Sequence, residues 1–220
     1  MIDLSCVQAN SSIQEIKEVA DFAKKYNCIC TFALPAHTPI LIELVKDYPQ
    51  ILVGGVVGFP DGGATTKGKV AEAHELIEMG VNELDMVINI AWLKNKQYGL
   101  LLNDIRSVVN EAGDIPVKVI LECHYLTNEE IVKACQIGVK AGVSFVKTGT
   151  GWAPTGATLE NVKIMKDTVG DACEVKAAGG VRNLETLLAM NKLGATRFGI
   201  GIRTAKAIFE GMERSGSEVY

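Results

Sequence analysis

The sequence has no surplus of basic residues: 22 lysines and arginines stand against 26 aspartates and glutamates, and the formal net charge is -4. Because nucleic-acid binding depends on clustered positive charge that neutralises phosphates, this balance argues against nucleic acid as a main partner. Local charges can still hold a small anionic molecule. We therefore expect small-molecule partners.

Long apolar runs and a secretory leader are also missing. No uninterrupted apolar stretch reaches the roughly 20 residues that cross a bilayer. The first residues, Met1 to Cys6, lack the basic start and the apolar run of a signal peptide. We therefore expect a cytoplasmic protein that makes no contact with a membrane.

Patterns that indicate a metal site or a disulfide framework are scarce. The three histidines form no HxH or HExxH group, and the six cysteines are scattered along the chain. Cys28 and Cys30 have the spacing that places two thiols on one face of a strand, but no further ligands stand beside them in the sequence. We interpret the cysteines as small buried residues, and we expect no metal site.

The chain does contain a regular alternation of apolar, β-branched runs with amphipathic segments. These runs recur about every thirty residues, which is the length of one βαβ unit. They are apolar on both faces, as buried parallel strands are. Eight such units close into a barrel, whereas five or six favour an open sheet. The predicted strands are Ile2–Ser5, Cys28–Ala33, Ile51–Val57, Glu83–Ile88, Val117–Glu122, Ser144–Thr148, Cys173–Ala177 and Thr196–Ile200.

We therefore predict an α/β protein with a (β/α)8 TIM barrel and an additional or leading N-terminal helix, formed by residues 1–220 as a single domain. Between the strands, the apolar spacing predicts a helix from Ile13 that ends at Tyr26-Asn27. Another helix is predicted over Thr127–Gly142, which opens with a capping-box pattern. Residues 211–220 have the character of a flexible C-terminal tail.

The candidate reacting groups are charged residues at the C-terminal ends of strands, where barrel enzymes carry their chemistry. They are Asp85, Glu122, Lys147 and Lys176. The two lysines are one βαβ unit apart, so we expect them at similar depth on neighbouring strands, which are about 4.8 Å apart. Asp85 precedes Lys147 by two units, and alternate strands share a layer of inward side chains.

Two amines so close together have a chemical use. A second ammonium disfavours protonation of the first and burial acts in the same direction, so one lysine becomes a neutral amine near neutral pH. Such an amine attacks a carbonyl and forms an imine, while Asp85 exchanges protons with Lys176. The alternative is a buried ion cluster that only fills the barrel. We consider it less favourable, because apolar side chains fill a core at least as stably.

Glycine-rich segments follow the last three predicted strands and indicate an anion site. Loops after the late strands of such barrels often hold phosphate with backbone N–H groups and a helix N-terminus. One segment alone is a weak indication, because glycine also ends strands. Three in succession beside two arginines favour the site. The candidate substrate- or anion-binding residues are Thr148, Thr150, Gly151, Gly179, Gly180, Arg182, Gly199, Gly201 and Arg203.

Four segments together resemble the deoxyribose-phosphate aldolase family of class I aldolases. They are Val57–Gly62, Glu83–Asn89, Phe145–Gly151 and Val175–Arg182. The resemblance implies a (β/α)8 barrel with Lys147 as the Schiff-base lysine and with Asp85 and Lys176 as a proton-relay pair. It implies reversible cleavage of 2-deoxyribose 5-phosphate to acetaldehyde and glyceraldehyde 3-phosphate, without metal or organic cofactor. It also implies a homodimer or higher homo-oligomer.

Three departures from the family pattern concern the substrate side of the site. Ile2–Ser5 replaces Ile-Asp-His-Thr, and Lys147–Gly151 replaces Lys-Thr-Ser-Thr-Gly. The last strand of the family ends in Gly-x-Ser-Ser, whose serines help to hold phosphate, whereas Gly199–Arg203 has neither hydroxyl. Arg203 either holds a phosphate or carboxylate as a bidentate fork, or lies in solvent in the first turn of the last helix. We expect the imine chemistry to survive, whereas the acceptor is either that of the family or a different one.

Three further residues have open roles. His124 and Tyr125 either contact substrate or belong to a polar loop before a helix. Tyr220, the last residue, either folds over the site as a proton donor, as in some members of the family, or lies in a frayed terminus.

The leading functional hypothesis is a class I aldolase for 2-deoxyribose 5-phosphate. The first alternative is a Schiff-base aldolase of the same family for another sugar phosphate, an unphosphorylated sugar or a carboxylate-bearing substrate. The second is a sugar-phosphate isomerase, which has no need of a neutral amine. A third is a barrel that binds without turnover, against which the intact Asp85, Lys147 and Lys176 argue. The fold alone does not choose among them.

Overall fold

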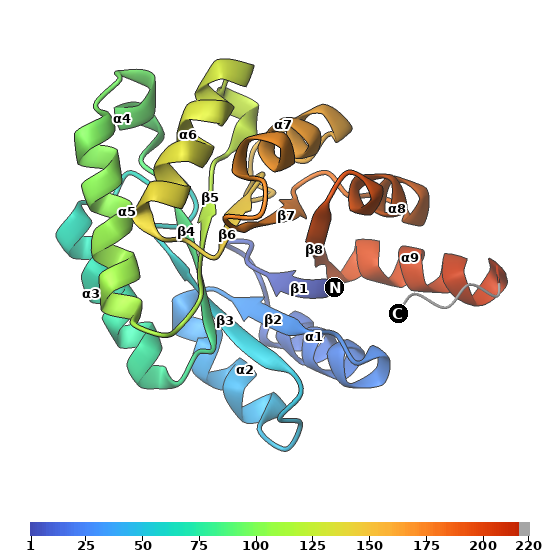
Figure 1. The fold of residues 1–220 in the computed structure, drawn as a ribbon. Coiled ribbons are helices and arrows are strands. Elements are labelled where there is room, and N and C mark those ends of the chain that lie inside the picture. Colours follow the sequence, from blue (N-terminus) through green and yellow to red (C-terminus); the bar gives the residue numbers. More distant parts are fainter. Residues whose placement is uncertain (216–220) are drawn as a thin grey trace.

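The computed structural model describes residues 1–215 and contains a closed barrel of eight parallel strands in sequence order (Figure 1). The first strand pairs with both the second and the last, which closes the barrel. The predicted TIM barrel is therefore confirmed. The strands are β1 (Ile2–Cys6), β2 (Cys30–Ala33), β3 (Leu52–Val57), β4 (Glu83–Val87), β5 (Val117–Ile120), β6 (Phe145–Lys147), β7 (Glu174–Ala178) and β8 (Ala195–Gly201).

Helices connect successive strands and pack around the outside of the barrel (Figure 1). Two short 3-10 helices, η1 (Pro35–His37) and η2 (Cys123–Tyr125), precede the second and sixth α-helices. No helix of residues 1–215 is both long and apolar enough to cross a membrane. The α-helices are α1 (Ile13–Tyr26), α2 (Thr38–Val45), α3 (Thr66–Met79), α4 (Ile90–Lys94), α5 (Tyr98–Ala112), α6 (Asn128–Ala141), α7 (Leu159–Val169), α8 (Leu184–Lys192) and α9 (Ile202–Ser215).

Two details of the predicted architecture need correction. The additional helix is α4, which follows β4; it does not lead the chain, because β1 already begins at Ile2. The predicted tail begins too early, because α9 continues through Gly211 to Ser215. A glycine weakens a helix by about 1 kcal/mol, but it does not necessarily end one. Residues 216–220 lie outside the described part of the chain.

Local sequence sets the ends of the predicted helices. The Ser12 side chain accepts the Glu15 N–H and the Glu15 carboxylate accepts the Ser12 N–H, which caps the start of α1. The helix is followed by Asn27 in the left-handed conformation, which asparagine tolerates well. Thr127 and Glu130 form the predicted capping box at the start of α6. Both predicted helices are confirmed.

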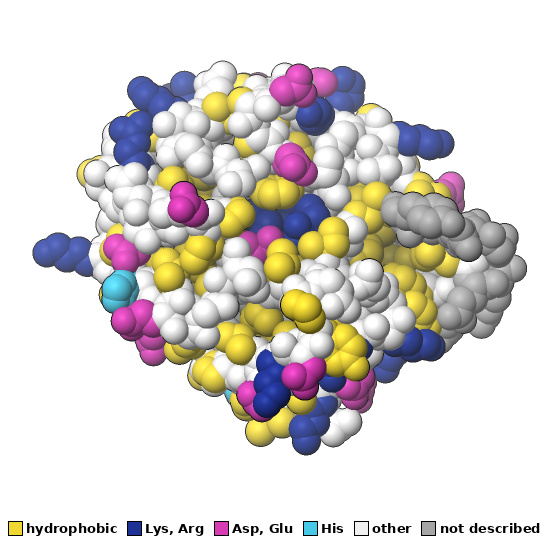
Figure 2. All heavy atoms as spheres, turned by 60° about the horizontal axis from the view of Figure 1, so that its bottom comes forward, with side chains coloured by type: hydrophobic (Ala, Val, Ile, Leu, Met, Phe, Trp, Pro, Cys, Tyr) yellow, Lys and Arg dark blue, Asp and Glu magenta, His cyan; other side chains and the backbone are white. Residues whose placement is uncertain are grey.

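The barrel interior combines an aromatic ring with charged groups. A Cβ atom on Gly54 of β3 would come within 2.1 Å of the Phe32 ring, so glycine leaves the room that the ring occupies. The centroid of this ring lies 4.3 Å from Lys176 Nζ, within the range of a cation–π contact. Figure 2 shows the face onto which the loops from helix to strand open. Charged side chains of both signs lie in the hollow at its centre, with apolar side chains around them.

A buried ion pair joins α3 to α5. Lys69 Nζ lies 2.7 Å from Asp104 Oδ2, and both side chains are fully buried. The same amine donates to the Val87 carbonyl at the end of β4, and the Thr66 hydroxyl donates to the other Asp104 oxygen. These contacts fix two helices relative to the strand that carries Asp85.

Asp104→Ala should lower the free energy of unfolding by about 3 kcal/mol or more, because removal of one partner leaves a buried charge without compensation. Chemical denaturation measures this change. Glu43→Ala is the matched control, since Glu43 pairs with Lys46 in solvent, and it should leave the denaturation midpoint unchanged. Equal midpoints for the two variants would contradict the structural role of the buried pair.

Candidate active site

Seven charged side chains from six of the strands meet inside the barrel. The strands differ in position along the chain, but their inward-facing residues converge because the sheet is closed. The residues are Asp3 of β1, Glu83 and Asp85 of β4, Lys118 of β5, Lys147 of β6, Lys176 of β7 and Arg197 of β8.

Asp85 is the centre of this cluster. Its Oδ2 atom lies 2.7 Å from both Lys147 Nζ and Lys176 Nζ, and its Oδ1 atom lies 3.2 Å from Lys118 Nζ. Lys147 and Lys176 are paired residues on adjacent strands, as the spacing in the sequence predicts. The structure therefore brings the three predicted catalytic side chains into direct contact.

The remaining ion pairs complete a ring. From Lys118 the contacts run to Glu83 at 2.5 Å and on to Arg197 at 2.9 Å. Arg197 contacts Asp3 at 2.6 Å, and Asp3 contacts Lys176 at 2.7 Å. Lys147 stands outside the ring, and within residues 1–215 its ion pair is with Asp85.

Counting charges shows which group can lose its proton. Three carboxylates face four cationic side chains, so a fully ionised cluster carries one excess positive charge. Release of one proton makes the cluster neutral. Lys147 is the cation with the fewest carboxylate partners, and it lies at the pocket surface with 8 % exposure. It is therefore the group from which the proton leaves at least cost.

The pKa of Lys147 agrees with this count. Burial lowers the pKa of this amine, Asp85 raises it and Lys176 lowers it again, so the pKa falls from the usual value near 10.5 to about 8. A substantial fraction of Lys147 is then a neutral nucleophile near neutral pH. Burial is the largest cause, and the second ammonium contributes in the direction that the sequence predicts.

The other two groups are held charged. Burial would raise the pKa of Asp85, but Lys118, Lys147 and Lys176 hold it well below its usual range. Burial would lower the pKa of Lys176, but Asp3 and Asp85 raise it above its usual value. One lysine of the pair can therefore attack a carbonyl, while its neighbour stays a proton donor.

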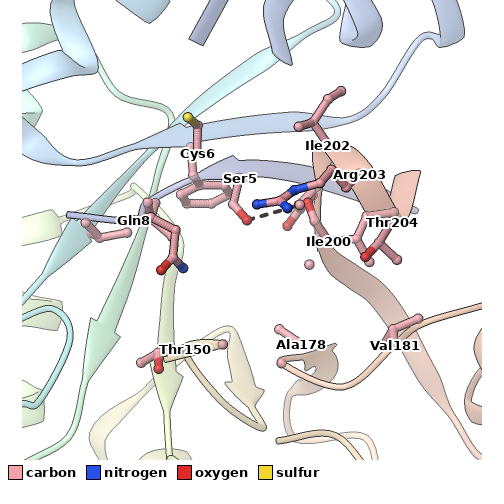
Figure 3. A pocket seen from close by; sticks show the side chains of 18 of the residues that line it. Ser5, Cys6, Gln8, Thr150, Ala178, Val181, Ile200, Ile202, Arg203 and Thr204 are labelled. Atoms are coloured by element: carbon pink, nitrogen blue, oxygen red, sulfur yellow. Dashed lines mark hydrogen bonds between the residues drawn. The ribbon is translucent and has the colours of Figure 1, made fainter. Parts of the chain in front are cut away.

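A cavity of about 440 Å³ opens above these lysines (Figure 3). Lys147 and Lys176 lie in its lining, and the loop after β1 and the start of α9 form adjacent parts of the wall. Figure 3 shows the Arg203 side chain extending from α9 toward Ser5. The cavity is therefore lined by the Lys147 amine and by the guanidinium of Arg203.

Comparison with known proteins adds a family to this geometry. The model of the DeoC/LacD family aldolases matches residues 7–211. The chain belongs to this family. A deoxyribose-phosphate aldolase of Rhizobium meliloti is 46 % identical over 205 residues, which are 93 % of this chain and 83 % of the relative. One of Staphylococcus epidermidis is 44 % identical over 213 residues, which are 97 % of this chain and 96 % of the relative.

Solved structures agree with this assignment. A Coccidioides immitis protein superposes with a TM-score of 0.91 at 33 % identity, covering 96 % of this chain and 84 % of that one. The deoxyribose phosphate aldolase of Aeropyrum pernix, which is tetrameric, superposes with a TM-score of 0.87 at 24 % identity, covering 96 % and 89 %. The second likeness is one of fold.

The predicted anion-binding residues of this DeoC/LacD aldolase mostly line the cavity. Thr148 does not: its hydroxyl donates to the Ala178 carbonyl and accepts the Ala178 N–H, so it joins β6 to β7 and faces away from the cavity. The predicted residues in the lining are Thr150, Gly151, Gly179, Gly180, Arg182, Gly199, Gly201 and Arg203.

His124 and Tyr125 are not among the residues of this lining. His124 Nδ1 lies 2.6 Å from the Thr155 hydroxyl, and Tyr125 is 51 % exposed. Both lie in η2, beside the site and outside the cavity wall. Tyr220 lies outside the described residues.

Sequence reasoning missed four members of the cluster, namely Asp3, Glu83, Lys118 and Arg197. A signal was present for Glu83, which is two residues before Asp85 on a buried strand and so shares its face. Lys118 is likewise a charged residue in an apolar strand. The rule that selected Lys147 would have selected both.

Acetylation of Lys147 should reach half of its maximal rate near pH 8, because only the neutral amine reacts. Competitive acetylation followed by peptide mass spectrometry measures this pH. Lys46 is the internal control, since its hydrogen bond to Glu43 raises its pKa. In Lys176→Met the midpoint for Lys147 should rise, because a neighbouring positive charge is lost. A midpoint for Lys147 equal to that of Lys46 would contradict this electrostatic picture.

Proposed function

We propose that this DeoC/LacD aldolase is a class I aldolase that forms a Schiff base on Lys147 and cleaves 2-deoxyribose 5-phosphate reversibly to acetaldehyde and glyceraldehyde 3-phosphate. The observation that supports this most is the Lys147 amine, with its pKa of about 8, in contact with Asp85 at the base of a cavity. The curated relatives of Rhizobium meliloti and Staphylococcus epidermidis carry the same activity in their names. Such a reaction belongs to carbohydrate catabolism.

Imine formation follows from the contacts of the cluster. The neutral Lys147 amine attacks the aldehyde carbon of the open-chain sugar, and the resulting hydroxyl leaves as water after it gains a proton. Lys176 is the donor of that proton, because its raised pKa keeps it charged and Asp85 holds it beside Lys147. Asp85, which its lysine neighbours hold ionised, keeps the two amines in place for this transfer.

Carbon–carbon cleavage then uses the imine as an electron sink. The electron pair of the bond between the second and third carbons moves into the protonated imine and forms an enamine on Lys147. The third carbon leaves as the aldehyde of glyceraldehyde 3-phosphate as its hydroxyl loses a proton. Protonation of the enamine and hydrolysis release acetaldehyde and restore the amine.

The far end of the cavity supports binding of the phosphate. Gly151 and Gly179 adopt positive φ angles of 83° and 74°, which bring backbone close to the cavity. The N-terminus of the 14-residue helix α9 and the cation of Arg203 lie across from them. Backbone N–H groups and a guanidinium together favour an anion.

The same end of the cavity favours one alternative, an acceptor other than glyceraldehyde 3-phosphate. Gly201 and Ile202 line the wall at the positions where the family pattern has its two serines, and neither side chain donates a hydrogen bond. Arg203 suits a carboxylate as well as a phosphate. An aldolase of the same family with a carboxylate-bearing or different sugar substrate is therefore the second candidate.

We also propose that the enzyme works in the cytoplasm as a homodimer or higher homo-oligomer. Its six cysteines are free and buried, which fits a compartment that keeps thiols reduced. Exposed apolar side chains such as Leu100, Leu159 and Leu188 provide surface that an interface could cover.

Incubation with 2-deoxyribose 5-phosphate and borohydride should leave a reduced two-carbon adduct on Lys147, because cleavage leaves acetaldehyde on the imine nitrogen. Mass spectrometry of the intact protein and of its peptides detects and locates the adduct. Lys147→Met is the negative control. An adduct with acetaldehyde but none with the sugar phosphate would favour the second candidate, and no adduct on Lys147 with either would refute Schiff-base catalysis.

Arg203→Met should raise the KM for 2-deoxyribose 5-phosphate about 10- to 100-fold, since a hydrogen bond to a charged group contributes about 1.5–3 kcal/mol. Steady-state kinetics measure this change, and trapping of acetaldehyde on Lys147 should not change. Lys206→Met is the matched control, because Lys206 also lies in α9 but pairs with Glu18 in solvent. An unchanged KM in Arg203→Met would remove this residue from the anion site.

A further inference from the structure

Glu122 has an unusual backbone for a buried glutamate. It stands two residues after the end of β5, is 2 % exposed and has φ 54° and ψ 63°. Residues other than glycine, asparagine and aspartate rarely adopt this left-handed conformation, and such strain is concentrated at functional sites. The leading mechanism above makes no use of this carboxylate.

The local hydrogen bonds explain the direction of the Glu122 side chain. The Leu121 N–H donates to the Lys147 carbonyl, and the Cys123 N–H donates to the next carbonyl, that of Thr148. Leu121 and Glu122, the two residues after β5, thus lie opposite the single residue Thr148 after β6, as in a β-bulge. The bulge turns the Glu122 carboxylate toward the loop that follows Lys147.

That loop is built around the carboxylate. The Thr150 hydroxyl donates a short hydrogen bond to Glu122 Oε2, and the Thr150 N–H lies 3.3 Å from each carboxylate oxygen. A Cβ atom on Gly149 would come within 2.7 Å of Glu122 Oε1. Glycine at this position, where the family pattern has serine, therefore gives the carboxylate its room.

These bonds fix which way the Thr150 hydroxyl can act. Its hydrogen is donated to Glu122, and it accepts the Trp152 N–H at 3.0 Å. A hydroxyl has one donor and two acceptor lone pairs, so one lone pair is left for another donor. Thr150 lines the cavity together with Lys147 (Figure 3). It therefore presents an acceptor to a substrate hydroxyl.

We infer that Glu122, acting through Thr150, removes the proton from the substrate hydroxyl on the carbon that becomes the acceptor aldehyde. This inference rests on the proposed aldolase reaction. As the carbon–carbon bond breaks, its electron pair enters the imine on Lys147 and the hydroxyl oxygen forms the new carbonyl. The hydroxyl proton passes to Thr150 Oγ1, and the original proton of Thr150 passes to Glu122. In the direction of synthesis each transfer runs backward.

The electrostatics of the two carboxylates support this division of work. Burial raises the pKa of Glu122, although the hydrogen bonds from Thr150 and the charges of Lys147 and His124 act against it. Asp85 is instead held well below its usual pKa range by three lysines. Glu122 is thus the better proton acceptor, whereas Asp85 serves to hold the amines.

The test uses acetaldehyde as the only substrate. It separates the formation of the enamine from the formation of the carbon–carbon bond, in which the new hydroxyl group takes up a proton. Exchange of the methyl protons of acetaldehyde with D2O requires the imine and enamine alone. Self-addition of acetaldehyde requires in addition a proton for the new hydroxyl. In Glu122→Gln, which keeps the acceptor oxygen but cannot carry the proton, self-addition should fall about 100-fold or more while exchange is retained. Both rates are measured by NMR on the full-length protein.

Two further variants and a control complete the test. Thr150→Val should show the same split between the two rates, and Thr150→Ser should restore most of the self-addition. Protonation of Lys147 slows both reactions at low pH, so the ratio of self-addition to exchange is the quantity that reports on Glu122. This ratio should fall at low pH in the wild-type protein and should not fall in Glu122→Gln. Glu130→Gln is the matched control, because Glu130 also pairs with a threonine, Thr127, but at an exposed helix cap. It should leave both rates unchanged.

The outcomes that overturn the inference are distinct from those that overturn the proposed function. Equal losses of exchange and self-addition in Glu122→Gln would make Glu122 a structural residue, and an unchanged rate of self-addition would leave it without a role. Wild-type protein that shows neither exchange nor a borohydride adduct on Lys147 would refute the aldolase itself.

Discussion

The contact of Asp85 with two lysines is the interaction on which the rest of the site depends. One carboxylate oxygen of Asp85 lies 2.7 Å from the amine of Lys147 and 2.7 Å from that of Lys176. Its negative charge offsets the repulsion between the two amines, so both can lie in the same layer of the barrel. The same contact separates their behaviour, because Lys176 gains a second carboxylate in Asp3 and Lys147 does not. Together with burial, this difference of one partner leaves Lys147 partly neutral and keeps Lys176 protonated.

The polar interior has to be balanced because burial of charge is costly. Removal of an ionised group from water costs several kcal/mol even after relaxation, and a neighbouring opposite charge offsets this only when the geometry is good. The ring through Glu83, Lys118, Arg197 and Asp3 supplies that geometry. These residues stabilise the charge state of the site and are therefore part of its chemistry.

The barrel and the contact between the catalytic residues could be predicted from the sequence, because both depend on the regular spacing of strands along the chain. Lys147 and Lys176 are one structural unit apart, which fixes them as neighbours in a parallel sheet. Asp3 and Arg197 meet only because the sheet closes on itself, and they are 194 positions apart, so no local pattern relates them. The bulge at Glu122 was missed for a different reason: a strand that ends at Ile120 reads the same in sequence as one that continues to Glu122.

The pairing of Asp3 with Arg197 has a consequence for how the molecule forms. Asp3 belongs to the first strand and Arg197 to the last, so the charges of the interior are complete only when both ends of the barrel have met. During synthesis on the ribosome, a chain that has not yet reached β8 holds Asp3, Glu83 and the lysines without their full set of partners. The early strands therefore have no stable way to close before the last one emerges. Assembly of the barrel and assembly of the reaction centre are then a single event.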